Sequence, residues 1–173
     1  GSKAHLLKSA LEVAVVGDDA PVPLADRPAY TAIATGRTIR ERVEATADGL
    51  MGESLWSGWG IRTMSTGDAA YNPLSYHNGT VWPHDTSLAA WGLSRHGHLA
   101  EARRIGRALI EAAAHFDWSL PEVFAGYARD ETPFPIAYPT AARPQAWAAA
   151  AAVGLAVDER RHDGGTSLQG QNR

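Results

Sequence analysis

Two long irregular stretches, residues 53–81 and 116–143, flank a pair of helical patterns that are joined by only two or three residues. Such a short connection requires the two helices to be antiparallel neighbours. In an up-down arrangement, the two long connections then emerge at the same end of the helical layer. Irregular connections of this length are uncommon in compact domains and are usually functional. We therefore expect a helical scaffold with a loop-built site at one end.

Apolar residues at helical spacing predict the scaffold itself. One amphipathic pattern starts at Thr38 and stops at Gly52, a second starts at residues 82–83 and runs to about 95, and a third covers about 99–115. Pro83 suits the first turn of the second helix, where its missing N–H costs nothing. A fourth pattern begins at 144–145 and continues to about 157, and residues 3–17 are compatible with a further helix. No sustained β alternation is present, so the predicted class is all-α.

Composition and charge exclude several classes of protein. Hydrophobic residues make up 45% and charged residues 20%, which are ordinary values for a soluble globular domain. A net charge of -3 gives no electrostatic case for nucleic acid or an anionic membrane as partner. The chain has no cysteine, and hence no disulfide or thiolate metal site. Neither a signal peptide nor a membrane span is evident, which favours a cytoplasmic protein.

The two long stretches carry aromatic rings beside amide, imidazole and carboxylate groups, the combination that binds carbohydrate. Individual residues keep alternative interpretations. The tryptophans are either loop anchors or ligand platforms. His77 and His84 have no third ligand in phase, so hydrogen-bonded loop histidines or substrate contacts are favoured over a zinc pair. Asp85 either complements the helix dipole or binds substrate, and Arg62 is either a surface residue or a partner of Asp85 or Glu122.

Glu122 stands out because it follows a proline and is flanked by Leu120, Val123 and Phe124. A carboxylate in such an apolar setting either anchors the N–H groups of its own loop or is poised for proton transfer. The residues alone leave both interpretations open.

Four segments together resemble the amylo-α-1,6-glucosidase family. This is the glucosidase part of glycogen debranching enzymes, close to the mannosylglycerate-hydrolase-like glycosidases. The segments are 57–63 (SGWGIRT), 71–85 (YNPLSYHNGTVWPHD), 120–126 (LPEVFAG) and 144–147 (PQAW). They occur in the family's order, and the resemblance covers about residues 42–157.

The resemblance implies an (α/α)6 toroid, of which this chain would supply part as antiparallel helical hairpins with long loops at one end. It implies hydrolysis of an α-glucosidic bond with inversion, without a metal or cofactor. Glu122 would be the general base that activates water. Inversion requires two carboxyl groups roughly 6.5–9.5 Å apart. The residues that the resemblance assigns to sugar binding are Trp59, Tyr76, His77, Asn78, Trp82, Asp85, Gln145 and Trp147.

The general acid of the family is an aspartate in a Trp-Lys-Asp motif, and this sequence contains no such motif. We therefore expect part of a glycoside hydrolase domain over residues 42–157 that is inactive alone, between a poorly matched helix and loop at 1–41 and a frayed polar tail at 158–173. The expected partner is an α-glucan or glucoside. The alternatives are a non-catalytic carbohydrate-binding or partner-dependent helical module, and a fragment that self-associates through exposed helix faces.

Overall fold

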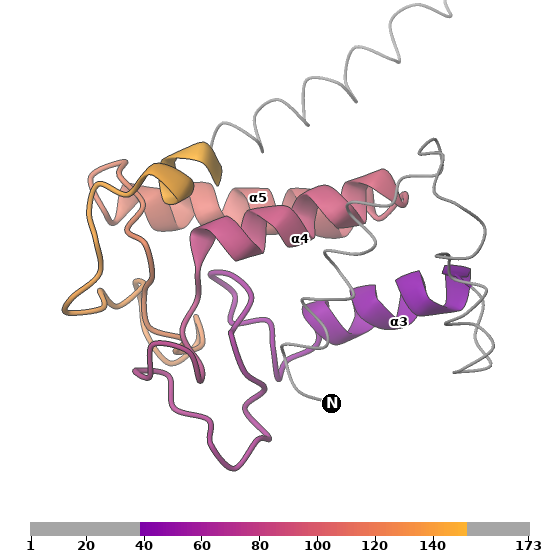
Figure 1. Ribbon diagram of the computed structural model, residues 1–173, viewed down its shortest axis with the longest axis horizontal. Coiled ribbons are helices and arrows are strands. Elements are labelled where there is room, and N and C mark those ends of the chain that lie inside the picture. Colours follow the sequence, from indigo (N-terminus) through magenta and orange to yellow (C-terminus); the bar gives the residue numbers. More distant parts are fainter. Residues whose placement is uncertain (1–38, 152–173) are drawn as a thin grey trace, which may run out of the picture.

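The computed structural model describes residues 39–151 and is helical, as the sequence predicts (Figure 1). Helix α3 covers Ile39–Met51, α4 covers Pro83–Arg95 and α5 covers Leu99–Ala114. A further helix begins at residue 146. The predicted starts of α4, α5 and the fourth helix lie within two residues of the observed ones. The helix considered for residues 3–17, the end of the fourth helix and the tail at 158–173 lie outside the described residues.

Helices α4 and α5 form the predicted antiparallel hairpin and pack against each other along their length. Gly97 makes the turn between them with a φ of +88°, a conformation that glycine adopts without steric cost. The backbone N–H of Gly97 donates to the Ser94 carbonyl, and that of His98 donates to the Leu93 carbonyl. These bonds satisfy carbonyls that would otherwise lack partners at the end of α4.

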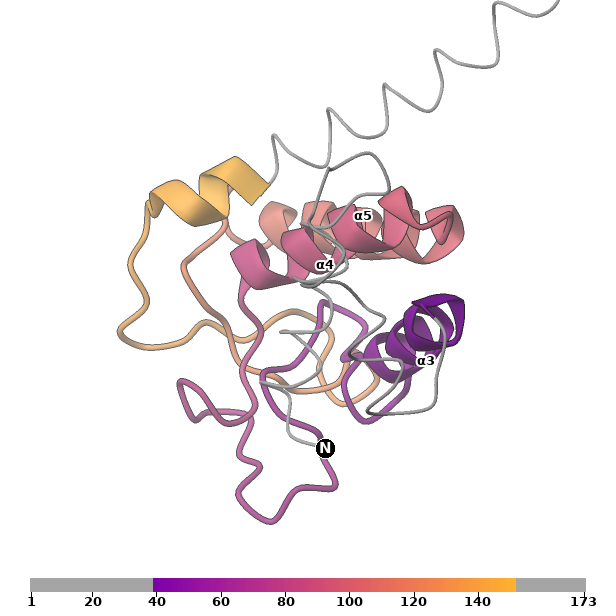
Figure 2. The same cartoon turned by 45° about the vertical axis from the view of Figure 1, so that its right-hand side comes forward.

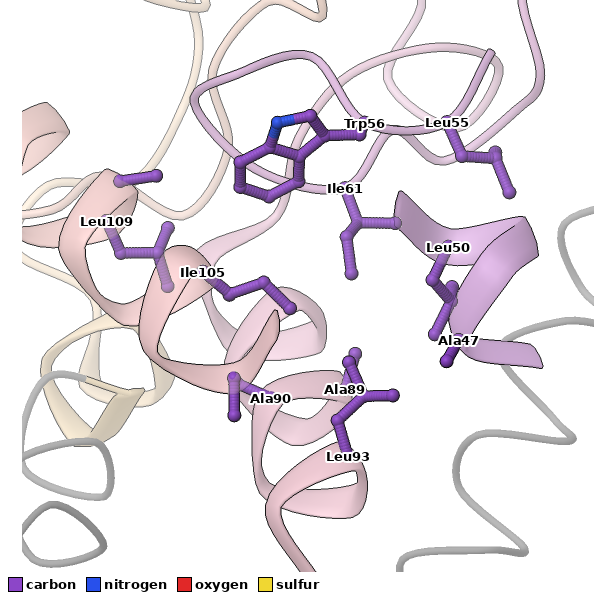
Figure 3. Close-up of a cluster of buried hydrophobic side chains, with 12 residues drawn as sticks. Ala47, Leu50, Leu55, Trp56, Ile61, Ala89, Ala90, Leu93, Ile105 and Leu109 are labelled. Carbon is purple, nitrogen blue, oxygen red and sulfur yellow. The ribbon is translucent and has the colours of Figure 1, made fainter. Parts of the chain in front are cut away.

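A buried apolar cluster joins the hairpin to α3 and to the first long loop (Figure 3). Ile105 and Leu109 of α5 are 0% and 1% exposed, and they lie one helical turn apart on the same face. The side chain of Trp56 packs into this cluster from the loop, and the Arg104 guanidinium lies 5.0 Å from its ring centroid. Trp56 is therefore a loop anchor, one of the two roles that its sequence position allows.

The two long loops gather at the end of the hairpin where the chain enters α4 and leaves α5 (Figures 1 and 2). Sequence alone did not predict that they pair. Among the described residues, isolated antiparallel bridges link Arg62 to Val81, Val81 to Phe124, and Phe124 to Ala137. Val81 and Phe124 exchange two backbone hydrogen bonds, of 2.9 and 3.0 Å. Single bridges of this kind leave residues 39–151 without a strand while fixing one loop against the other.

Candidate active site

A close approach of two glycines fixes the register between the loops. A Cβ atom on Gly126 would lie 1.7 Å from the carbonyl oxygen of Gly79, so the second loop crosses the first at a distance that only glycine allows. The backbone N–H of Gly126 also donates to the Pro73 carbonyl at 2.9 Å. The segment that contains Tyr76 is thereby held beside the segment that contains Glu122.

Arg62 also holds the two loops together at this crossing. Its side chain is buried, and it donates to three backbone carbonyls: Nε to Gly126 at 2.6 Å, and Nη1 to Glu53 at 3.0 Å and Trp56 at 3.2 Å. The Tyr71 hydroxyl donates to the Gly126 carbonyl as well. Arg62 is therefore neither a surface residue nor, in its hydrogen bonds, a partner of Asp85 or Glu122. It is a structural residue that binds both loops.

Glu122 lies at the start of the paired segment and is half-buried, while its sequence neighbours Pro121 and Val123 are buried. Its backbone N–H donates to the Ala142 carbonyl at 3.0 Å, and its Oε2 accepts from the Ala142 N–H at 3.4 Å. The carboxylate therefore has one backbone contact within its own loop. A half-buried carboxylate that is held at one oxygen has the form of a positioned base.

Tyr76 brings an aromatic group to the carboxylate. Burial raises the pKa of the Tyr76 phenol, and the neighbouring Glu122 carboxylate raises this pKa further, through a hydrogen bond and through its charge. The Tyr76 ring makes edge contacts with His77 and Trp82, each with a centroid distance of 4.7 Å. Tyr138 of the second loop lies 5.5 Å away. Tyr138 was not among the predicted site residues; its position before a proline in the second loop was the only signal.

Trp82 is the residue before α4. Its indole is held by stacking on one face and by hydrogen bonds from its Nε1. His77 stacks on the indole with an interplanar angle of 7° and a centroid distance of 5.8 Å. The indole Nε1 donates to the Tyr76 carbonyl at 3.1 Å and to Thr80 Oγ1 at 3.2 Å. Tyr76, His77, Trp82 and Glu122 therefore form one aromatic and carboxylate group across the two loops.

A second group lies where α4 and the fourth helix begin. The His84 and Trp147 rings are 5.0 Å apart, and His84 Nδ1 lies 3.6 Å from Asp85 Oδ1. Gln145 Oε1 accepts from the Ala148 N–H at 2.7 Å, which caps the fourth helix. The Trp147 side chain is exposed. The structure thus brings Trp147 to His84 at the start of α4, and His84 also lies beside the predicted Asp85.

The remaining two predicted residues lie apart from these contacts. Asn78 is half-buried and fixed through its backbone, which donates to the Ser75 carbonyl and accepts from the Asn72 N–H. Trp59 is 2% exposed and has the Arg129 guanidinium 4.2 Å from its ring centroid. Among the described residues, its Nε1 is a buried polar atom without a hydrogen-bond partner.

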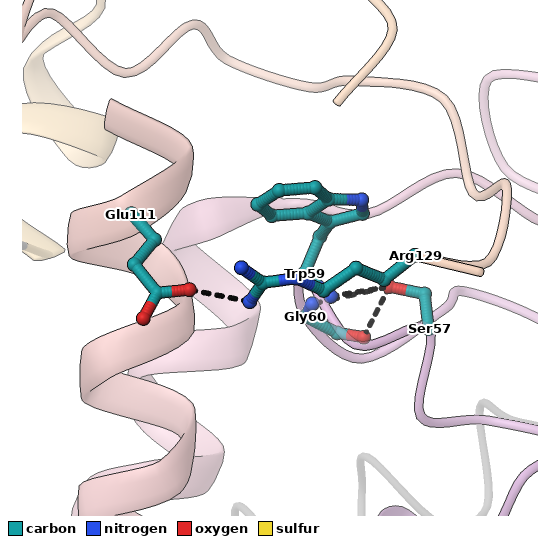
Figure 4. A network of polar contacts seen from close by, with 5 residues as sticks. All are labelled: Ser57, Trp59, Gly60, Glu111 and Arg129. Atoms are coloured by element: carbon teal, nitrogen blue, oxygen red, sulfur yellow. Dashed lines mark hydrogen bonds and ion pairs between the residues drawn. The ribbon is translucent and has the colours of Figure 1, made fainter. Parts of the chain in front are cut away.

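A polar network holds Arg129 over the Trp59 ring (Figure 4). The Arg129 guanidinium binds the Glu111 carboxylate of α5, and the Arg129 backbone N–H donates to the Ser57 carbonyl at 2.8 Å. Ser57 Oγ donates to the Gly60 carbonyl at 2.8 Å and accepts from the Gly60 N–H at 3.1 Å. Sequence analysis missed Arg129, because it lies in a charged segment with no distinctive spacing.

The described residues offer neither a metal cluster nor a membrane span. Over residues 39–151, no group of three or more His, Cys, Asp or Glu side chains is placed to hold a metal ion. None of the helices in this range is both long and apolar enough to cross a membrane.

A helical scaffold with a half-buried carboxylate and clustered aromatic rings on paired loops has the features of a carbohydrate-active domain, and a family comparison identifies the class as glycoside hydrolase. The model that matches describes the mannosylglycerate hydrolase MGH1-like glycoside hydrolase domain, and it matches residues 9–127. Because the match covers more than half of the 173 residues, the chain belongs to this family. The comparison with curated proteins gives no match.

Proposed function

We propose that this chain is part of an inverting glycoside hydrolase that acts on α-glucosidic bonds of the amylo-α-1,6-glucosidase type, with Glu122 as the general base. The observation that carries the proposal is the setting of Glu122. Its carboxylate is half-buried, bonded at Oε2 to the Ala142 N–H, and next to the Tyr76 phenol. In the complete enzyme the helices would belong to an (α/α)6 toroid, and the setting would be cytoplasmic glucan breakdown.

The aromatic residues support a sugar substrate. Indole and phenol faces stack on the C–H face of a pyranose, while carboxylate and amide groups bind its hydroxyls. Tyr76, His77 and Trp82 supply rings beside Glu122, and Trp147 and Asp85 supply a ring and a carboxylate at the start of the neighbouring helices. Asn78 of the first loop and Gln145 beside Trp147 would complete the sugar-binding set, and the buried Trp59 would support it from within the first loop.

The proposed step needs two carboxyl groups, of which this chain supplies one. Glu122 takes a proton from water as the water oxygen attacks the anomeric carbon, and the glycosidic bond breaks on the opposite face. Departure of a sugar oxygen requires a proton from a general acid, which is typically worth about 10²–10⁴-fold in rate. The sequence has no Trp-Lys-Asp motif to provide it. We therefore propose that the chain alone does not hydrolyse branched dextrins.

A substrate that needs no acid isolates the role of Glu122. α-Glucosyl fluoride has a leaving group that departs as fluoride without a proton, so the base step alone limits its hydrolysis. We expect the chain to release fluoride and to form β-glucose, as followed by a fluoride electrode and by proton NMR of the fresh product. Glu122→Gln should lower this rate by about 10²–10⁴-fold. The matched control is Glu53→Gln, which alters an exposed carboxylate of the same chain.

Two results would overturn the proposal: formation of α-glucose, or full activity of Glu122→Gln. The lack of a recognisable acid favours one second candidate, a non-catalytic carbohydrate-binding or partner-dependent module. That candidate predicts binding of α-glucans to the chain, with no fluoride release above the uncatalysed rate.

A further inference from the structure

Trp118 is the most exposed of the large hydrophobic side chains in residues 39–151, at 73%. In the same range, no other ring stacks on it and no guanidinium lies over it. The exposed Trp91, in contrast, has the Arg95 guanidinium 5.5 Å from its centroid, and Trp147 packs on His84. Trp118 therefore presents a bare indole to solvent.

The backbone under this indole has a rare conformation. Asp117 and Trp118 have φ values of +50° and +61°, a region that bulky residues seldom adopt because the side chain crowds the backbone. Such strain persists only where neighbouring contacts impose it, and it concentrates at ligand-binding positions. An indole that is 73% exposed gains little burial energy in the free protein to offset this strain.

Several hydrogen bonds impose the conformation. The Trp118 N–H donates to the Ala113 carbonyl at 2.8 Å, at the end of α5. Arg143 Nη2 donates to the Phe116 carbonyl at 2.6 Å and to Asp117 Oδ2 at 2.7 Å. Phe116 itself is buried and packs on Phe124. The backbone that carries the indole is therefore held by hydrogen bonds from α5 and from Arg143.

The segment that holds the backbone at Trp118 also contacts the proposed base, Glu122. Arg143 follows Ala142, which exchanges hydrogen bonds with Glu122, and Trp118 precedes Glu122 by four positions. One short segment thus holds both the bare indole and the carboxylate. The two sequence neighbours of Trp118 are polar: Asp117 is 92% exposed and Ser119 is half-exposed. A lone ring with a polar rim suits a sugar better than a protein partner, which would need a larger apolar patch.

We propose that Trp118 forms an outer saccharide subsite, on which a sugar ring of an α-glucan stacks outside the position of the reacting glucosyl unit. This inference rests on the proposed function and adds to it that the substrate is an oligosaccharide or longer glucan. Trp118 is a specificity residue and takes no part in proton transfer.

The test compares a long ligand with a short substrate. Calorimetry with maltotetraose measures an affinity that includes the outer subsite. Hydrolysis of α-glucosyl fluoride depends only on the reacting position, because this substrate has a single sugar ring. We expect Trp118→Ala to weaken maltotetraose binding by about tenfold, and Trp118→Phe to weaken it less. Both variants should keep the wild-type kcat/KM for α-glucosyl fluoride. Trp91→Ala, which removes another exposed indole, should change neither quantity.

A further variant separates ligand binding from a structural role. Trp118→Gly removes the indole and relieves the backbone crowding, so it should melt at the same temperature as wild type or higher, while binding maltotetraose as weakly as Trp118→Ala. A lower melting temperature would assign Trp118 to structure and overturn the proposal.

Other outcomes are equally decisive. Undetectable binding of maltotetraose to wild type, or equal binding by Trp118→Ala and wild type, would overturn the subsite. So would a Trp118→Ala effect confined to oligomeric state in sedimentation, since that would indicate a protein contact. If fluoride hydrolysis fails but binding depends on Trp118, then the subsite stands and the hydrolase proposal does not. If fluoride hydrolysis succeeds but maltotetraose binding does not depend on Trp118, then the hydrolase proposal stands and the subsite does not.

Discussion

Glu122 and Ala142 are joined by two hydrogen bonds that run in opposite directions: the Glu122 backbone N–H donates to the Ala142 carbonyl, and the Ala142 N–H donates to Glu122 Oε2. The two interpretations of Glu122 from sequence, loop anchor and proton acceptor, are therefore compatible. One oxygen anchors the carboxylate, and that contact limits its rotation.

The Glu122–Tyr76 contact predicts a pH effect. Because the raised pKa lets folded Tyr76 hold its proton more tightly than the unfolded chain does, the free energy of unfolding should fall as pH rises above about 10. Below pH of about 10 this group contributes no slope. Tyr76→Phe should make the fall shallower, as measured by urea unfolding between pH 8 and 11.

The same contact can be tested from the other side. Glu122→Gln removes the charge beside the phenol, so the pKa of Tyr76 should decrease in an NMR titration of its ring carbon. Glu53→Gln should leave that titration unchanged. An unaltered Tyr76 titration in Glu122→Gln would contradict the contact.

Gly126→Ala should separate the two loops. The added Cβ would lie 1.7 Å from the Gly79 carbonyl oxygen, which neither backbone can avoid without moving. Overpacking of this kind costs about 3 kcal/mol in free energy of unfolding, and α-glucosyl fluoride hydrolysis should be lost with it. The control is Gly67→Ala, where the nearest atom to the new Cβ is 3.6 Å away. Equal stability of the two variants in urea would show that the loops do not cross as described.

Two isoleucines of α5 provide a matched pair for the core. Ile105 is 0% exposed and Ile110 is 47% exposed. Ile105→Ala should lower the free energy of unfolding by about 2–5 kcal/mol, because it leaves a cavity in the cluster that joins the hairpin to α3. Ile110→Ala should change it by less than about 0.5 kcal/mol. Similar losses for both variants, in chemical denaturation, would indicate that the face of α5 carrying Ile110 is also covered.

Two arginine–tryptophan pairs test how much burial of the ring strengthens the contribution of a cation–π contact to stability. Arg129 lies over the buried Trp59 and Arg95 over the exposed Trp91. Arg129→Ala should cost about 1–2 kcal/mol, because the cation also covers a desolvated ring, whereas Arg95→Ala should cost about 0.5 kcal/mol. A larger loss of stability for Arg95→Ala than for Arg129→Ala would contradict this prediction. The Arg129–Glu111 ion pair is half-exposed, so its coupling energy in a double-mutant cycle should fall with added salt.

The sequence predicted the helices well because each has a regular apolar period, as at Ile105 and Leu109, and a clear boundary, such as Pro83 or Gly97. It also predicted that the long loops share one end, since that follows from connection lengths. It did not predict that Val81 pairs with Phe124, because a single bridge has no alternation to detect. The family assignment to glycoside hydrolases is confirmed by the match over residues 9–127.

Side-chain environments in the loops were the hardest to predict. Trp59 and Trp118 are both tryptophans in irregular segments, yet one is 2% exposed and the other 73%. Arg129 covers the Trp59 ring, and it lies far from Trp59 in sequence, so the periodicity of the loop gives no sign of this contact. The roles assigned to the individual site residues through the resemblance stay predictions.

The Val81–Phe124 pairing also has a consequence for how the molecule folds. The whole α4–α5 hairpin lies between the two residues in sequence, so the pairing closes a long stretch of chain. Closing a flexible stretch of that length is slow, but a hairpin formed from local contacts brings its own two ends together first. The loops should therefore pair late, after the hairpin is complete. Substitutions at Val81 or Phe124 should then speed unfolding while leaving the refolding rate nearly unchanged.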